Sequence, residues 1–128
     1  MEYHISRTVA MSFEEAVARV VEELKKEGFG VITEIDLQAA LKAKLGVDFR
    51  PYRIIGACNP PLAHKAVQAE DKIGVMLPCN VLVQEHAPGQ VEVSSANPSL
   101  MMDLVGNPAL SDLAREVTRR LRAVLARL

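Results

Sequence analysis

The chain has 128 residues, of which 49% are hydrophobic and 24% charged, a balance that is typical of a globular protein and argues against a disordered one. A net charge of −1 argues against a protein that binds nucleic acid by neutralising phosphates, and no apolar run reaches the roughly 18 residues of a membrane span. Because the first residues also lack an apolar signal segment, we predict a single cytoplasmic domain over residues 1–128, with no nucleic-acid partner and no membrane.

The first helix is marked at both ends. Residues 2–10 alternate weakly between apolar and polar side chains, as a strand does. Ser12 and Glu15 then have the spacing of a capping box, and apolar residues recur on one face as far as Gly28. The sequence therefore predicts a strand followed by a helix that begins after Ser12 and ends at Gly28.

Residues 29–37 alternate in the manner of a second strand. Its more apolar side is expected to face the helices, so that Glu34 and Asp36 share the opposite face with Ile32. Asp36 also precedes a short helical pattern that ends at Gly46. It is therefore a candidate N-cap as well as a candidate site residue.

Three Asn-Pro pairs introduce the later helices. Residues 52–57 read as a third strand, and Asn59-Pro60 then provides a cap followed by a proline at the first helical position. Asn97-Pro98 and Asn107-Pro108 repeat this arrangement before a helix that ends at Gly106 and before the long C-terminal helix.

Residues 73–77 form an apolar run that Pro78 interrupts, and three topologies fit it. In the first, a strand begins only at Cys79 and pairs antiparallel with residues 52–57. In the second, the run itself is a parallel return strand. In the third, one continuous strand extends to His86 with a bulge at Pro78.

Residues 81–86 and 91–95 flank Pro88 and Gly89 and predict a β-hairpin. The Pro-Gly pair suits a type II turn, which twists poorly with a tight hairpin, so the loop is expected to exceed two residues. Helices and strands in mixed order with a hairpin indicate an α+β fold, in which helices cover one face of a sheet. The uncovered face needs a partner, and we predict a weakly held homodimer.

Both cysteines stand beside asparagine, in Ala-Cys58-Asn59-Pro and Pro-Cys79-Asn80. The first two topologies place Cys58 and Cys79 at the same edge of the sheet, whereas the third moves Cys79 to mid-strand. Two buried, unreactive thiols are one interpretation. The alternative is a reactive Cys58 before a helix N-terminus, with Cys79 as its partner.

Polar residues near these dipeptides extend the candidate site. Asn80 has no helix to cap, and Glu85 shares a mostly apolar side of its strand, so both are candidates for a polar pocket together with Glu34. Two cysteines about 20 residues apart lack the paired spacing of a zinc site, and we therefore predict no metal.

Three blocks of the sequence also resemble a known family. They are GFGVITEIDLQAAL, YRIIGACNPPLAHKA and IGVMLPCNVLV, and they are similar to the uncharacterised domain-of-unknown-function family number 302. The resemblance implies a two-layer α+β fold related to the TATA-binding-protein-like group, with a curved, mainly antiparallel sheet and helices on one face. It implies no established activity. The motif residues that it carries over are Glu34, Asp36, Cys58, Asn59, Pro60, Pro78, Cys79, Asn80 and Glu85.

These observations favour a domain that binds a small polar ligand in one cleft, with no cofactor that the sequence identifies. The expected lining is Glu34, Asp36, Cys58, Asn59, Cys79, Asn80 and Glu85. A thiol-dependent redox or transfer enzyme that uses Cys58 with Cys79 is the second hypothesis. An interaction module that works through the sheet surface or the arginine-rich last helix is the third.

Overall fold

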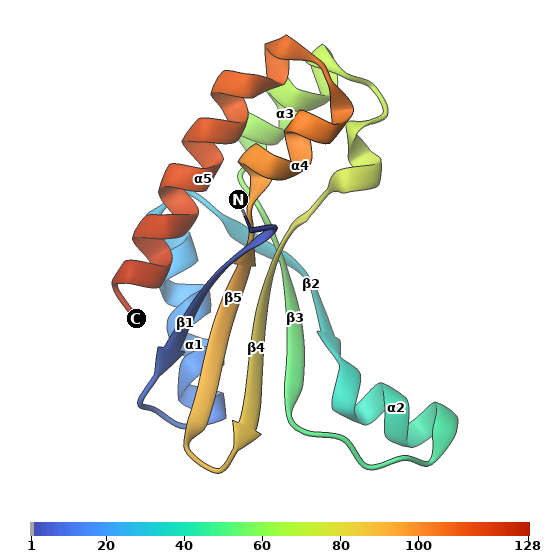
Figure 1. Ribbon diagram of the computed structural model, residues 1–128, viewed down its shortest axis with the longest axis vertical. Helices are drawn as coiled ribbons and strands as arrows, with labels where there is room; N and C mark the ends of the chain where they lie inside the picture. The colour runs from blue at the N-terminus through green and yellow to red at the C-terminus, as the bar shows by residue number, and fades with distance from the viewer. Residues whose placement is uncertain (1) are drawn as a thin grey trace.

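The computed structural model describes residues 2–128 as an antiparallel sheet of five strands in the order β1-β5-β4-β3-β2 (Figure 1). The strands are β1 (His4–Val9), β2 (Gly30–Asp36), β3 (Tyr52–Cys58), β4 (Cys79–Ala87) and β5 (Gln90–Ala96). The helices are α1 (Phe13–Lys26), α2 (Leu37–Leu45), α3 (Pro60–Ala69), α4 (Pro98–Val105) and α5 (Ser111–Ala126), with short 3-10 helices η1 (Ile73–Met76) and η2 (Pro108–Leu110). This is the two-layer α+β fold that the sequence predicts.

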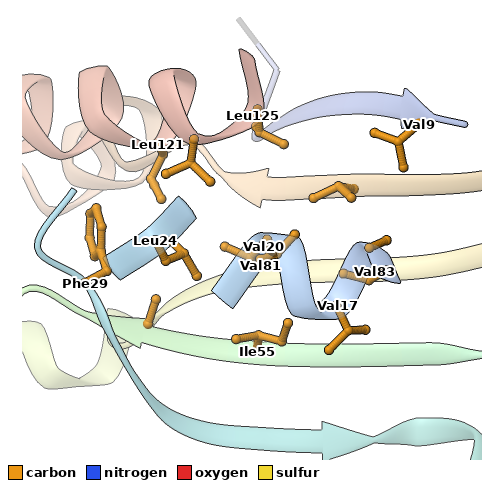
Figure 2. Packing of buried hydrophobic residues seen from close by; sticks show 14 of the residues in the cluster. Val9, Val17, Val20, Leu24, Phe29, Ile55, Val81, Val83, Leu121 and Leu125 are labelled. Atoms are coloured by element: carbon orange, nitrogen blue, oxygen red, sulfur yellow. The ribbon is translucent and has the colours of Figure 1, made fainter. Parts of the chain in front are cut away.

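The core lies between one face of the sheet and the helices α1 and α5 (Figure 2). Strand residues such as Ile55, Val83 and Val93 are completely buried there, because alternate side chains of a strand point to the same face. Helix α1 contributes its apolar stripe, which includes the fully buried Val20 and Leu24. None of the helices in residues 2–128 has the length and apolarity needed to cross a membrane.

A buried carboxylate joins the two core helices. Glu23 of α1 is 4% exposed and accepts hydrogen bonds from Lys26 (2.8 Å) and from Arg127 at the end of α5 (2.6 Å). These two hydrogen bonds lower the pKa of Glu23 to about 2, so the carboxylate stays ionised at neutral pH.

The predicted helix caps are confirmed at three of five positions. The side chains of Ser12, Asp36 and Asn59 accept hydrogen bonds from the backbone at the starts of α1, α2 and α3. Asn97 makes no side-chain cap hydrogen bond at the start of α4, and Asn107 caps η2 instead of α5.

The hairpin is also confirmed, but its loop is shorter than expected. Ala87 pairs with Gln90, and a bulge at the end of β4 provides the extra twist that a two-residue Pro-Gly turn lacks.

The apolar run before Pro78 is not a strand. Residues 73–76 form η1, in which the amide of Val75 donates to the carbonyl of Lys72 and that of Leu77 donates to Gly74. Local hydrogen bonds therefore replace the sheet ladder, and β4 begins only at Cys79. This is the first of the three topologies that the sequence leaves open.

The prediction of which β2 side chains point toward the helices is wrong after the first residues of the strand. The register with β3 shifts between Val31 and Thr33, so that Ile32 occupies a bulge. After the bulge, Glu34 pairs with Ile55, whose side chain lies in the core, and therefore faces the helix side. Thr33 and Ile35 take the uncovered face in place of Glu34 and Asp36, because one extra residue reverses the side-chain alternation.

The two ends of the sheet carry different elements (Figure 1). Helices α3, α4 and α5 gather with η1 beyond the end where β3 stops and β4 starts. Helix α2 projects from the opposite end, directly after β2.

Candidate functional site

The fold brings the two cysteines to the same edge of the sheet, as predicted. Ala57 of β3 pairs with Cys79 of β4, and Cys58 is the next residue of β3. Ordinary strand geometry then gives a Cα separation on the order of 6 Å between the cysteines. Both are free thiols and both are half-buried.

A cavity of about 280 Å³ opens where these strand ends meet the helices. Its floor includes Ala57, Cys58 and Cys79, and Ile32 and Phe29 from the β2 segment adjoin them. The rest of the wall comes from α3, η1, α4 and α5, with side chains that include Leu62, Ala66, Met102, Leu113 and Val117. The lining is almost entirely apolar, so the cavity favours an uncharged, apolar occupant over the polar ligand that the sequence suggests.

Asn59 lines this cavity, but its amide is committed to the scaffold. Its Oδ1 accepts a hydrogen bond from the amide of Leu62 (3.3 Å), which caps α3. Its Nδ2 donates to the carbonyl of Glu27 (3.3 Å), just after α1, and Arg120 of α5 donates to the same carbonyl (2.9 Å). Asn59 thus fastens α3 to the end of α1 and does not offer its amide to a ligand.

Burial changes the chemistry of Cys79. Desolvation, with a smaller contribution from the nearby Cys58 thiol, raises the pKa of Cys79 to about 11. Cys79 is therefore protonated at neutral pH, and a protonated thiol is a poor nucleophile.

The acidic candidates on β2 belong to a different cluster. Arg53 of β3 lies 3.2 Å from Glu34, 3.7 Å from Asp36 and 3.6 Å from Glu14 at the start of α1. The Arg53 guanidinium also stacks 5.3 Å from the ring of Phe13. The two β2 carboxylates are thus surface partners of Arg53 and do not line the cavity with the cysteines.

Asn80 and Glu85 also lie outside the cavity. Asn80 follows Cys79 in β4 and is exposed. Glu85 pairs with Val91 near the hairpin turn and lies six positions along β4 from Cys79, about 20 Å at the usual rise. Of the seven residues predicted for one cleft, the structure brings three together: Cys58, Asn59 and Cys79.

The helical side of the cavity is not predictable from the sequence. Met102 of α4 and Val117 of α5 are far from the cysteines in sequence and belong to ordinary amphipathic helices. Nothing in such a pattern separates a residue that lines a cavity from one that fills the core. Within residues 2–128, no group of three or more His, Cys, Asp or Glu side chains is placed to hold a metal ion.

Comparison with known proteins identifies the family. A family model described as Domain of unknown function DUF302 matches residues 5–128. The chain belongs to this family. A crystal structure of an uncharacterised conserved DUF302 protein from Bacillus stearothermophilus shares 30% sequence identity with it, with a TM-score of 0.92 over 99% of this chain and 98% of that one. No protein with a curated description matches the chain. The family that the sequence motifs suggest is thus confirmed for this DUF302 chain.

Proposed function

We propose that this DUF302 chain binds a small, uncharged, apolar molecule in the cavity between the strand ends and α3, α4 and α5. The cavity itself is the observation that carries the proposal, because it has a volume of about 280 Å³ and an apolar wall. Close-packed protein interiors rarely keep voids larger than a water molecule. Apolar cavities of about half this size are known to stay dry and to bind benzene or xenon.

The chemistry of the wall defines the ligand class. The polar side chain of Asn59 is held by Leu62 and Glu27, and the thiol of Cys79 is protonated at neutral pH. A charged ligand would lose its hydration without gaining a hydrogen-bonding partner of opposite charge. An aromatic or aliphatic molecule without charge loses little and gains dispersion contacts. Two free thiols fit a reducing compartment, so the cytoplasm is the location that accords with this proposal.

The test is a titration with indole, a neutral aromatic probe. Calorimetry and amide chemical shifts detect its binding. Ala66→Phe places a ring in the cavity and is expected to weaken indole binding at least about tenfold, with Ala63→Phe as a second filling variant. Ala43→Phe on α2 is the matched control, because Ala43 is exposed and far from the lining, and it should bind indole as the unchanged protein does. Absence of indole and xenon binding to the unchanged protein would refute the proposal, and so would undiminished binding to folded Ala66→Phe.

A further inference from the structure

Helices α3 and α4 both line the cavity and both begin with an Asn-Pro pair, but the two asparagines are bonded differently. At the start of α3, both amide atoms of Asn59 are hydrogen-bonded, and one of them caps the helix. At the start of α4, Nδ2 of Asn97 donates to the carbonyl of Glu2 (2.9 Å), but α4 has no side-chain cap. Asn97 is 3% exposed, and its Oδ1 has no hydrogen-bond partner within residues 2–128. Because an unpaired buried acceptor is unfavourable, the packed arrangement of α4 carries a free-energy cost that α3 does not.

Thr118 of α5 provides the hydrogen bond that Asn97 does not make. The backbone amide of Ser99, in the first turn of α4, donates to Oγ1 of Thr118 (3.2 Å), and the two hydroxyl oxygens lie 2.9 Å apart. In the described part of the chain, no other hydrogen bond or ion pair joins α4 to α5. An N-cap asparagine ordinarily accepts from the amide two or three positions later, and Ser99 is two positions after Asn97. The Ser99 amide therefore has a second acceptor within its own helix turn.

We propose that α4 is a lid over the cavity, and that the Ser99 amide passes from Thr118 to Asn97 when the lid opens. In the closed state, Pro98 and Met102 form part of the cavity wall, and Pro98 is the only fully buried residue of α4. In the open state, Asn97 caps the helix and its Oδ1 is no longer unpaired. Opening thus exchanges one hydrogen bond for another, and α4 separates from α5 without leaving the Ser99 amide unpaired.

The two ends of α4 are attached to the rest of the molecule independently of α5. Before the helix, the backbone amide of Asn97 donates to the carbonyl of Tyr3 (2.9 Å). After it, Gly106 has a left-handed backbone with φ +74°, and Nδ2 of Asn107 donates to the carbonyl of Ala69 (3.0 Å). The helix can therefore move as a unit between two fixed ends, as lids over ligand sites do. The inference rests on the proposed function, because it assigns to α4 the control of ligand entry, but the movement itself can be measured without a ligand.

The experiment measures alkylation of Cys79 by iodoacetamide at pH 7.5 in a Cys58→Ser background, because Cys79 lines the cavity. Thr118→Val removes the closed-state acceptor and should raise the alkylation rate at least about fivefold. Thr118→Ser keeps the hydroxyl group and should leave the rate unchanged. Asn97→Ala removes the open-state acceptor and should lower the rate, which a general loss of stability would not do. Ser12→Ala controls for such a loss, since Ser12 caps α1 and does not line the cavity, and its rate should be unchanged.

Two results would overturn the lid: an unchanged alkylation rate in folded Thr118→Val, or a raised rate in Asn97→Ala. Indole kinetics then connect the movement to ligand entry. Because the same opening precedes entry and release, Thr118→Val should bind and release indole faster by the same factor, with an unchanged Kd. Indole rates that do not change in this variant would also refute the lid. Altered alkylation rates without indole or xenon binding would refute the apolar-ligand proposal alone, and indole binding with unaltered alkylation rates would refute the lid alone.

Discussion

The cavity end of the molecule and the arm formed by β2 and α2 differ in the environment that they give to the predicted site residues. At the cavity end, strand termini and three helices surround two thiols with apolar atoms. Along residues 30–54, which span the arm and the start of β3, no residue is buried. Glu34 and Asp36 therefore remain hydrated surface partners of Arg53, while Cys79 becomes a desolvated thiol. The comparison shows that the candidate residues of the two regions differ in their access to water, which is low for Cys79 and high for Glu34 and Asp36.

The largest expected difference in the free energy of unfolding comes from substitution of two glycines, one in β3 and one in β2. Gly56 of β3 is packed so closely that an added methyl group would meet Thr33 and Pro78, whereas Gly30 of β2 has open space around it. Gly56→Ala should therefore lower the free energy of unfolding by about 3 kcal/mol. Gly30→Ala should change it by less than about 0.5 kcal/mol. Urea denaturation of both variants measures this, and equal stabilities would contradict the tight packing around Gly56.

The second largest expected difference is between the stability effects of the two asparagines that follow Cys58 and Cys79. Asn59→Ala removes a helix cap and the hydrogen bond to Glu27, so we expect a loss of about 2 kcal/mol in stability. Asn80 is exposed, and Asn80→Ala should cost less than about 0.5 kcal/mol. Because the two side chains serve different partners, the double variant should show additive losses. Strong coupling in thermal unfolding would instead show that Asn59 also holds the start of β4.

Thiol labelling sharpens the comparison within the cavity itself. At pH 7.5, iodoacetamide should alkylate Cys58 at least about tenfold faster than Cys79, because the raised pKa of Cys79 leaves almost no thiolate. Mass spectrometry of samples taken at successive times measures the alkylation of both cysteines. In Cys58→Ser only the slower alkylation of Cys79 remains to be measured. Equal labelling rates that rise together in denaturant would show two equivalent buried thiols.

The smallest expected effect concerns self-association through the surface that β2 leaves uncovered. Ile35 is 48% exposed beside Ile54 on the open face, and Leu45 of α2 is 69% exposed. We expect a weak homodimer that uses this surface, and Ile35→Lys should shift it toward monomer. Light scattering at tens of micromolar measures the mass. A monomeric mass for the unchanged protein would contradict this prediction. Val75→Lys on η1 is the control, because Val75 is an apolar residue that is 86% exposed elsewhere on the molecule.

Most of the fold follows from local signals in the sequence. Ser12, Asp36 and Asn59 predict helix starts correctly, because a side-chain cap acts on backbone groups only two or three residues away. The hairpin follows from the Pro-Gly pair for the same reason. The family motifs around Cys58 and Cys79 likewise point to the correct family and architecture.

Tertiary structure alone decided to which side of the sheet the β2 side chains point and which residues line the cavity. A one-residue bulge at Ile32 leaves no mark in the sequence, yet it reverses every side chain after it and moves Glu34 and Asp36 away from their expected face. Met102 and Val117 reach the cavity only because α4 and α5 fold back over the strand ends. The sequence therefore determined most of the helices and strands, but it left residues 73–77 and the position of Cys79 open among three topologies. Long-range packing determined which of the polar candidates lost contact with water, because desolvation depends on neighbours that are distant in the chain.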